Sequence, residues 1–327
     1  MGRDTEDRLK RWLAYGAQLA LTVLVTWFIV ESLGPGMGEL RSLDRAVWRP
    51  DLPLLALSCV VLLAGYFASA ALWGLIVVDL GGPRLPLAQV VQLFMVANLG
   101  RYLPGKVWQI AGLAVLARGR GVPAAVATGA AVLGQGVSLV AATLVGVLAL
   151  AAGPEELRAW GLAGAGLLGV AVALGLIPPV FRWAVGLWFR LARQEPPRAL
   201  GSGHALVWLV LFAANWVVYA LSFWILAASF GHSGDLLPVA SAFAAAYVLG
   251  YLMIFAPAGV GVREASLVAL LTPYMGPGAS GVLAVVARIW TTVVELVPAG
   301  LFWMRTMGKM GTTGGGRAQT SSEDADV

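Results

Sequence analysis

Long apolar runs alternate with short polar segments along the chain, and the lengths of these runs predict membrane-spanning helices. A helix rises about 1.5 Å per residue, so it needs about 17–25 apolar residues to cross the hydrocarbon core. Six runs reach this length: 12–33, 53–78, 123–152, 160–177, 205–230 and 277–303. The pattern therefore predicts an all-α polytopic membrane protein whose membrane domain covers residues 12–304.

Two further apolar regions, residues 87–117 and 237–271, are each interrupted in the middle. The interruptions contain Pro104 and Gly105 in the first region and Pro257, Gly259 and Gly261 in the second. Proline lacks the N–H that a helix interior needs, and glycine adds a flexible point. Each region therefore predicts a re-entrant hairpin, in which two half-helices enter the membrane and leave on the same side. Such broken backbone is tolerated only where protein or a wet cavity covers it.

The two interrupted regions occupy corresponding places in a predicted repeat. Pro104 and Pro257 lie 153 positions apart, and Gly100 and Gly250 lie 150 apart, each preceded by leucine. The first repeat covers about residues 84–152 and the second about 235–304. Paired interruptions of this kind indicate a midplane substrate site in transporters.

Composition supports the membrane class and excludes several others. Hydrophobic residues make up 59% of the chain and charged residues only 12%, whereas soluble domains carry about 25% charged residues. This excludes a secreted enzyme, a cytosolic dinucleotide-binding protein and a nucleic-acid binder. The abundance of arginine, alanine and glycine is typical of a GC-rich bacterial genome.

The distribution of basic residues predicts the orientation. With the N-terminus inside, the inner loops hold 14 of the 22 Lys and Arg residues and the outer loops hold 4. This positive-inside bias predicts a multi-pass protein of the bacterial inner (plasma) membrane. Residues 1–11 form a cytoplasmic N-terminus and residues 305–327 a disordered cytoplasmic tail. The two hairpins then enter from opposite sides, as an inverted repeat requires.

Residues 180–194 differ from the apolar runs. Arg182, Arg190 and Arg193 fall within about 80° of one another on a helical wheel, and tryptophans occupy other faces. This pattern predicts an amphipathic helix at the membrane interface.

Six charged residues lie in apolar surroundings, where each costs about 2.5–3.5 kcal/mol on insertion scales. The four cations and two nearby amides are candidate ligands for an anionic lipid headgroup: Arg101, Lys106, Arg263, Arg288, Asn98 and Gln109. The two acids, Glu264 and Glu295, are candidates for coupling protons or orienting the arginines. The alternative is structural ion pairing, of Arg263 with Glu264 or of Arg288 with Glu295.

Other chemistry is not indicated. The single cysteine, Cys59, excludes an internal disulfide, and the two histidines, His204 and His232, lie far apart in sequence. No lysine of a nucleotide-binding loop follows the glycines of the second interruption. We therefore expect no metal and no cofactor.

Two segments carry a family resemblance: residues 98–109 (NLGRYLPGKVWQ) and residues 257–264 (PAGVGVRE). They resemble the hallmark stretches of the lysylphosphatidylglycerol synthase transmembrane-region family, the flippase-like membrane domain of the multiple peptide resistance factor. The resemblance covers roughly residues 10–305 and implies a polytopic inner-membrane protein that handles lipids with charged or phosphate headgroups. The full-length synthases also have a soluble aminoacyl-transferase domain. This chain resembles only their membrane part, so we expect neither enzymatic activity nor a transfer RNA substrate.

These features favour a lipid flippase that moves an anionic or phosphate-linked headgroup between leaflets. The candidate lipids are phospholipids, aminoacyl-lipids and polyprenyl phosphates. Two alternatives stay open: a small-solute secondary transporter, and a non-transporting membrane partner of a cell-envelope glycolipid enzyme. The expected partners are membrane lipids and, under the last alternative, a glycosyltransferase or lipid synthase; no nucleic-acid partner is expected.

Overall fold

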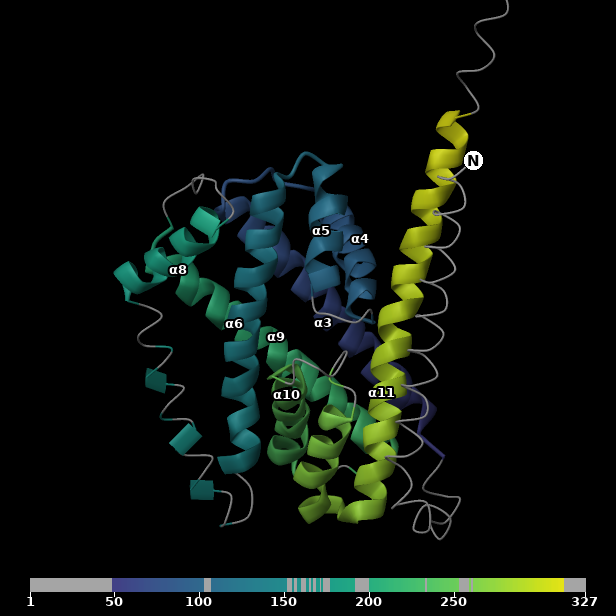
Figure 1. Cartoon of the computed structure of the whole chain (residues 1–327). Helices are drawn as coiled ribbons and strands as arrows, with labels where there is room; N and C mark the ends of the chain where they lie inside the picture. Colours follow the sequence, from purple (N-terminus) through teal and green to yellow (C-terminus); the bar gives the residue numbers. More distant parts are fainter. Residues whose placement is uncertain are drawn as a thin grey trace, which may run out of the picture.

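A computed structural model gives the fold shown in Figure 1. It describes residues 49–102, 107–151, 178–191, 200–232, 234–252, 259 and 261–314, with isolated positions between 155 and 177. The described part is helical and contains no strand. The predicted span 12–33 lies outside the described residues, as does much of 160–177.

Four helices are long and apolar enough to cross a membrane, which confirms four of the six predicted spans. They are α3 (Leu52–Asp79), α6 (Ala124–Ala151), α9 (Ser202–Ser229) and α11 (Val262–Gly314). The start of α3 follows from local chemistry, because the Asp51 side chain accepts a hydrogen bond from the Leu54 N–H at 3.0 Å. The fold is therefore that of an all-α polytopic membrane protein.

Small residues and aromatic rings hold the long helices together. Gly65 of α3 faces Tyr219 of α9 so closely that a Cβ there would lie 2.6 Å from the ring. A Cβ on Gly146 of α6 would lie 2.7 Å from the backbone nitrogen of Ala245, which belongs to α10 (Leu236–Leu252). Close backbone approach of this kind is a usual basis of helix association in membranes.

Both interrupted regions form helical hairpins. The first consists of α4 (Leu87–Asn98), the 3₁₀ helix η3 (Leu99–Tyr102) and α5 (Val107–Arg118). The second consists of α10 and the beginning of α11. In Figure 1, the α4–α5 hairpin occupies the upper half of the bundle and the α10–α11 hairpin the lower half, and their inner ends point toward each other. This is the arrangement predicted for two oppositely directed hairpins.

The two glycines that the sequence repeat pairs, Gly100 and Gly250, have the same role in the structure. A Cβ on Gly100 would lie 2.7 Å from the backbone nitrogen of Gln109 in the other arm of its hairpin. A Cβ on Gly250 would lie 3.0 Å from Cβ of Arg263, again in the opposite arm. Each glycine thus lets the two arms of its hairpin approach closely near the break.

The last span begins at a sharp kink in α11. Gly276 has a φ of 78° and a ψ of 163°, outside helical values, and Pro277 follows it. Beyond the kink the helix continues to Gly314, so residues 305–314, predicted to be disordered, are helical. No proline follows Pro298 to end this helix. Residues 315–327 of the predicted tail lie outside the described residues.

The predicted amphipathic segment is the helix α8 (Pro178–Leu191). Phe181, Val185 and Phe189 are buried, whereas Arg182 and Arg190 are exposed. The amphipathic pattern is therefore confirmed. The location of this helix at a membrane interface stays a prediction.

Candidate functional site

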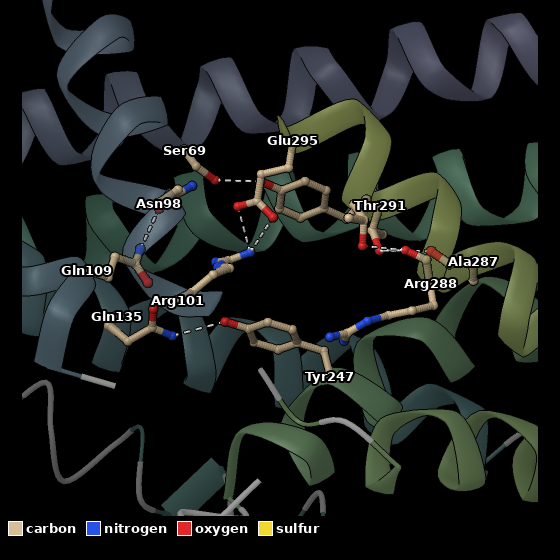
Figure 2. A network of polar contacts seen from close by, with 12 residues as sticks. Ser69, Asn98, Arg101, Gln109, Gln135, Tyr247, Ala287, Arg288, Thr291 and Glu295 are labelled. Atoms are coloured by element: carbon tan, nitrogen blue, oxygen red, sulfur yellow. Dashed lines mark hydrogen bonds and ion pairs between the residues drawn. The ribbon is translucent and has the colours of Figure 1, made fainter. Parts of the chain in front are cut away.

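A cavity of about 190 Å³ lies where the inner ends of the two hairpins meet α3, α6, α9 and the last span. This volume has room for on the order of ten water molecules. Predicted site residues that line it are Asn98, Arg101, Gln109, Gly259, Arg263, Arg288 and Glu295. The structure thus brings together residues as much as 197 positions apart, and Figure 2 shows several of them around one space.

Arg101, in η3 of the first hairpin, pairs with Glu295 of the last span. The Arg101 guanidinium nitrogen lies 3.0 Å from one carboxylate oxygen of Glu295 and 3.2 Å from the other. The Glu295 side chain is only 2% exposed, and that of Arg101 is 29% exposed. One arginine of the cavity is therefore neutralised by a buried acid from a distant part of the chain (Figure 2).

Arg288, also in the last span, pairs with Glu264 at the beginning of α11. The nearest nitrogen and oxygen are 3.6 Å apart. The other oxygen of Glu264 accepts a hydrogen bond from the Gly261 N–H at 2.7 Å. Glu264 thus also caps a helix start, because it satisfies one of the N–H groups that have no partner within the helix. Glu264 does not line the cavity.

The sequence suggested the ion pairs Arg263–Glu264 and Arg288–Glu295, and both suggestions are wrong. Arg288 and Glu295 are seven residues apart on one helix, which separates their backbones by about 10 Å along its axis. Their side chains meet different hairpins instead: Arg288 meets the second and Glu295 the first. Arg263 and Glu264 are adjacent, and neighbouring helical residues point about 100° apart.

Arg263 differs from the other two arginines of the cavity. Its guanidinium carbon lies 4.7 Å above the centre of the Phe243 ring, which is a cation–π contact. Among the described residues, it forms neither an ion pair nor a hydrogen bond. Arg263 lines the cavity and is the cation there whose charge no described carboxylate neutralises.

The predicted amides stabilise the first hairpin. Asn98 is 1% exposed, and its side-chain oxygen accepts a hydrogen bond from the Gln109 amide. This contact joins α4 to α5 directly beside the break. Both residues also line the cavity.

Sequence patterns did not single out the aromatic part of the cavity wall. The wall includes Tyr66 of α3, Trp216 and Tyr219 of α9, and Tyr247 and Tyr251 of α10. A signal existed for one pair, because Tyr247 and Tyr251 are four residues apart and so share a helix face.

The remaining predicted positions are only partly described. Gly259 and Gly261 have φ values of 70° and 83°, which suit glycine and explain the break in the second hairpin. Pro104, Gly105, Lys106 and Pro257 lie outside the described residues. Within the described part of the chain, no group of three or more His, Cys, Asp or Glu residues is suited to hold a metal ion.

Comparison with known proteins identifies the family. A search of curated protein sequences gave no match. The model of the family described as "Lysylphosphatidylglycerol synthase TM region" matches residues 15–299, which include both hairpins and every cavity residue named above. The chain therefore belongs to the lysylphosphatidylglycerol synthase transmembrane-region family.

Proposed function

We propose that this protein moves a lipid with an anionic or phosphate-linked headgroup between the two leaflets of a membrane. The headgroup would enter the cavity between the hairpins while the lipid chains stay in the surrounding bilayer. The process is transport without chemical conversion. Membership of a family named for the membrane region of a lipid synthase supports lipid handling in general.

The observation that carries the proposal is the charge balance around the cavity. Three arginines, Arg101, Arg263 and Arg288, line it, but the described part of the chain supplies two carboxylates for them, and neither pairs with Arg263. An uncompensated cation within a membrane domain is costly. Two oxygens of a phosphate group can accept two parallel hydrogen bonds from one guanidinium, which makes Arg263 a suitable anchor for the headgroup.

The two acids are best interpreted as orienting groups. Glu295 holds Arg101 and Glu264 holds Arg288, so each carboxylate positions one arginine at the edge of the space beside Arg263. A headgroup phosphate would compete with these carboxylates for the same guanidinium groups. We propose this competition as the means by which the loaded and empty cavities differ.

The proposed setting is the bacterial inner membrane, with both termini in the cytoplasm. The excess of basic residues in the loops assigned inside supports this orientation. The first hairpin would then open toward the cytoplasm and the second toward the outside, so the cavity would lie between two half-membrane barriers.

Lipid translocation in reconstituted vesicles tests the proposal. The purified protein is expected to accelerate the movement of tail-labelled phosphatidylglycerol between leaflets. Arg263→Ala should slow this movement by about 10–100-fold, since a hydrogen bond to a charged group contributes about 1.5–3 kcal/mol. Arg263→Lys should restore only part of the rate, because the planar fork is lost.

The matched control is Arg190→Ala, which removes an exposed arginine of α8 and should leave the rate unchanged. Melting temperature is measured for every variant. If Arg263→Ala melts much earlier than the native protein, its slow transport reflects lost stability and the anchoring role is rejected. Uptake of water-soluble phosphate without lipid movement would favour a small-solute transporter. Co-purification of a lipid synthase without any transport would favour a membrane partner.

A further inference from the structure

The side chain of Arg263 lies along α10, the opposite arm of its own hairpin. Its base meets Gly250, where an added Cβ would lie 3.0 Å from Cβ of Arg263. Its guanidinium carbon lies 4.7 Å above the centre of the Phe243 ring. Gly250 and Phe243 are seven residues apart, so they share one face of α10 and are separated by about 10 Å along its axis. Arg263 therefore extends over two turns of α10 and ends on Phe243.

The Phe243 ring is itself held in place by two other rings. Phe223 of α9 stacks on it, with ring centres 5.0 Å apart and planes inclined by 19°. Trp290 of the last span meets it edge-on, with centres 6.0 Å apart and planes inclined by 67°. All three side chains are buried. The guanidinium of Arg263 thus rests on a rigid surface, because close-packed rings from three elements cannot follow its movement.

For Arg263, this ring takes the place that a carboxylate has for the other two arginines of the cavity. Arg101 and Arg288 each direct a guanidinium nitrogen toward a glutamate. An aromatic face attracts a cation through its quadrupole, without the oxygen lone pairs that accept N–H groups. Phe243 can therefore hold the charge of Arg263 while the N–H groups stay available to an anion that enters the cavity.

The ring also keeps Arg263 away from the two acids. Glu264 is its neighbour in sequence, and Glu295 lines the same cavity. A guanidinium released within a membrane domain would be drawn to such carboxylates. An arginine that pairs with a carboxylate no longer offers its full fork to a phosphate. The apparent affinity for an anion falls in proportion to the fraction of molecules in the binding-competent arrangement, which the ring maintains.

Building on the proposed function, we propose that Phe243 is the positioning residue for Arg263. Its ring holds the guanidinium by a cation–π contact in the empty cavity and keeps the N–H groups free for the headgroup phosphate. Phe243 acts through Arg263 and needs no contact of its own with the phosphate.

Fluorinated phenylalanines at position 243 test this role. Fluorine withdraws electrons from the ring, so 4-fluoro-, 3,5-difluoro- and 3,4,5-trifluorophenylalanine attract a cation progressively less while their size changes little. Titration calorimetry in detergent measures the binding of dihexanoylphosphatidic acid, a short-chain lipid with a bare phosphate. Its Kd should rise stepwise along the series, by about 2–30-fold in total, the range that the strength of a cation–π contact allows.

Transport separates positioning from a general loss of activity. With tail-labelled phosphatidylglycerol in vesicles, trifluorophenylalanine at position 243 should raise the half-saturating lipid fraction by a similar factor and leave the maximal rate unchanged. The matched control places the same three analogues at Phe189, a fully buried phenylalanine of α8, and should change neither quantity. Phe243→Leu, which is apolar but has no ring, should raise the Kd at least as much. If that variant fails to fold, the fluorinated series still decides.

The outcomes distinguish this proposal from the proposed function. A Kd that stays constant or falls along the series, while Arg263→Ala still abolishes binding, overturns the role of Phe243 and leaves the phosphate anchor intact. Equal increases for the Phe189 and Phe243 series also overturn it, because fluorine then acts through packing. If the native protein neither binds dihexanoylphosphatidic acid nor moves phosphatidylglycerol, the proposed function fails and the positioning role fails with it.

Discussion

The two hairpins carry the same kind of residue beside their breaks but use it differently. Arg101 of the first hairpin is held by Glu295, which comes from the last span. Arg263 of the second hairpin has no carboxylate partner among the described residues, although Glu264 is its neighbour in sequence. Glu264 instead caps the start of α11 and pairs with Arg288.

This difference shows that the last span determines which arginine of the cavity is left to bind an anionic ligand. It contributes one acid to the first hairpin and one base to the second, seven residues apart on a single helix. Among the described charges beside the breaks, Arg101 of the first hairpin is thereby neutralised and Arg263 of the second is left without a carboxylate partner. The two hairpins are similar in architecture, but only the second contributes an arginine, Arg263, that has no described carboxylate partner.

The largest expected difference between the two hairpins is the side of the membrane that their outer ends face. Single cysteines at Arg120 and Asp235, both exposed, are introduced in a Cys59→Ala background. An impermeant thiol reagent should label Asp235→Cys from outside the cell and Arg120→Cys only after the membrane is opened. Labelling of both positions from one side would contradict the inverted arrangement of the hairpins.

The two ion pairs should differ in their contribution to stability. Glu295→Gln leaves Arg101 without its buried acid and should lower the free energy of unfolding by about 2–3 kcal/mol, below the usual cost because Arg101 is partly exposed. Glu264→Gln should cost only about 1 kcal/mol, since its pair is longer and glutamine can still accept from the Gly261 N–H. Chemical denaturation in detergent provides the comparison.

A double-mutant cycle separates the ion pair from other losses. Arg101→Ala combined with Glu295→Ala should cost less than the sum of the two single changes, because the residues are in direct contact. Strict additivity would mean that the contact contributes nothing to stability.

The paired glycines provide the smallest effect and the sharpest comparison between the hairpins. Gly100→Ala should destabilise the protein by about 1–3 kcal/mol, since its Cβ meets rigid backbone. Gly250→Ala should cost less, because its nearest neighbour would lie 3.0 Å away rather than 2.7 Å, and Gly112→Ala, with no neighbour closer than 3.9 Å, should cost nothing. A melting temperature that falls most for Gly100→Ala, less for Gly250→Ala and not at all for Gly112→Ala would support close approach of the hairpin arms at Gly100 and Gly250. A larger loss at Gly112 than at Gly100 would refute it.

Local pattern was sufficient to predict the elements and the charged residues of the cavity. Helix length in a bilayer is set by its thickness, so apolar runs revealed α3, α6, α9 and the last span. Proline and glycine act within a few residues of themselves, so they located both breaks. The cost of inserting charge singled out Arg101, Arg263, Arg288 and Glu295 as residues that require a polar environment.

The sequence by itself therefore determined the membrane class, the two interrupted hairpins and the charged residues that need a cavity. Only the tertiary structure decided which charges pair and which surface completes the site. Arg101 meets Glu295 across 194 positions, and Gln135 meets Tyr247 across 112. No periodicity within a helix encodes contacts between helices, because they depend on how whole helices pack and rotate against one another. The lack of a described carboxylate partner for Arg263 and the aromatic part of the cavity wall are consequences of that packing.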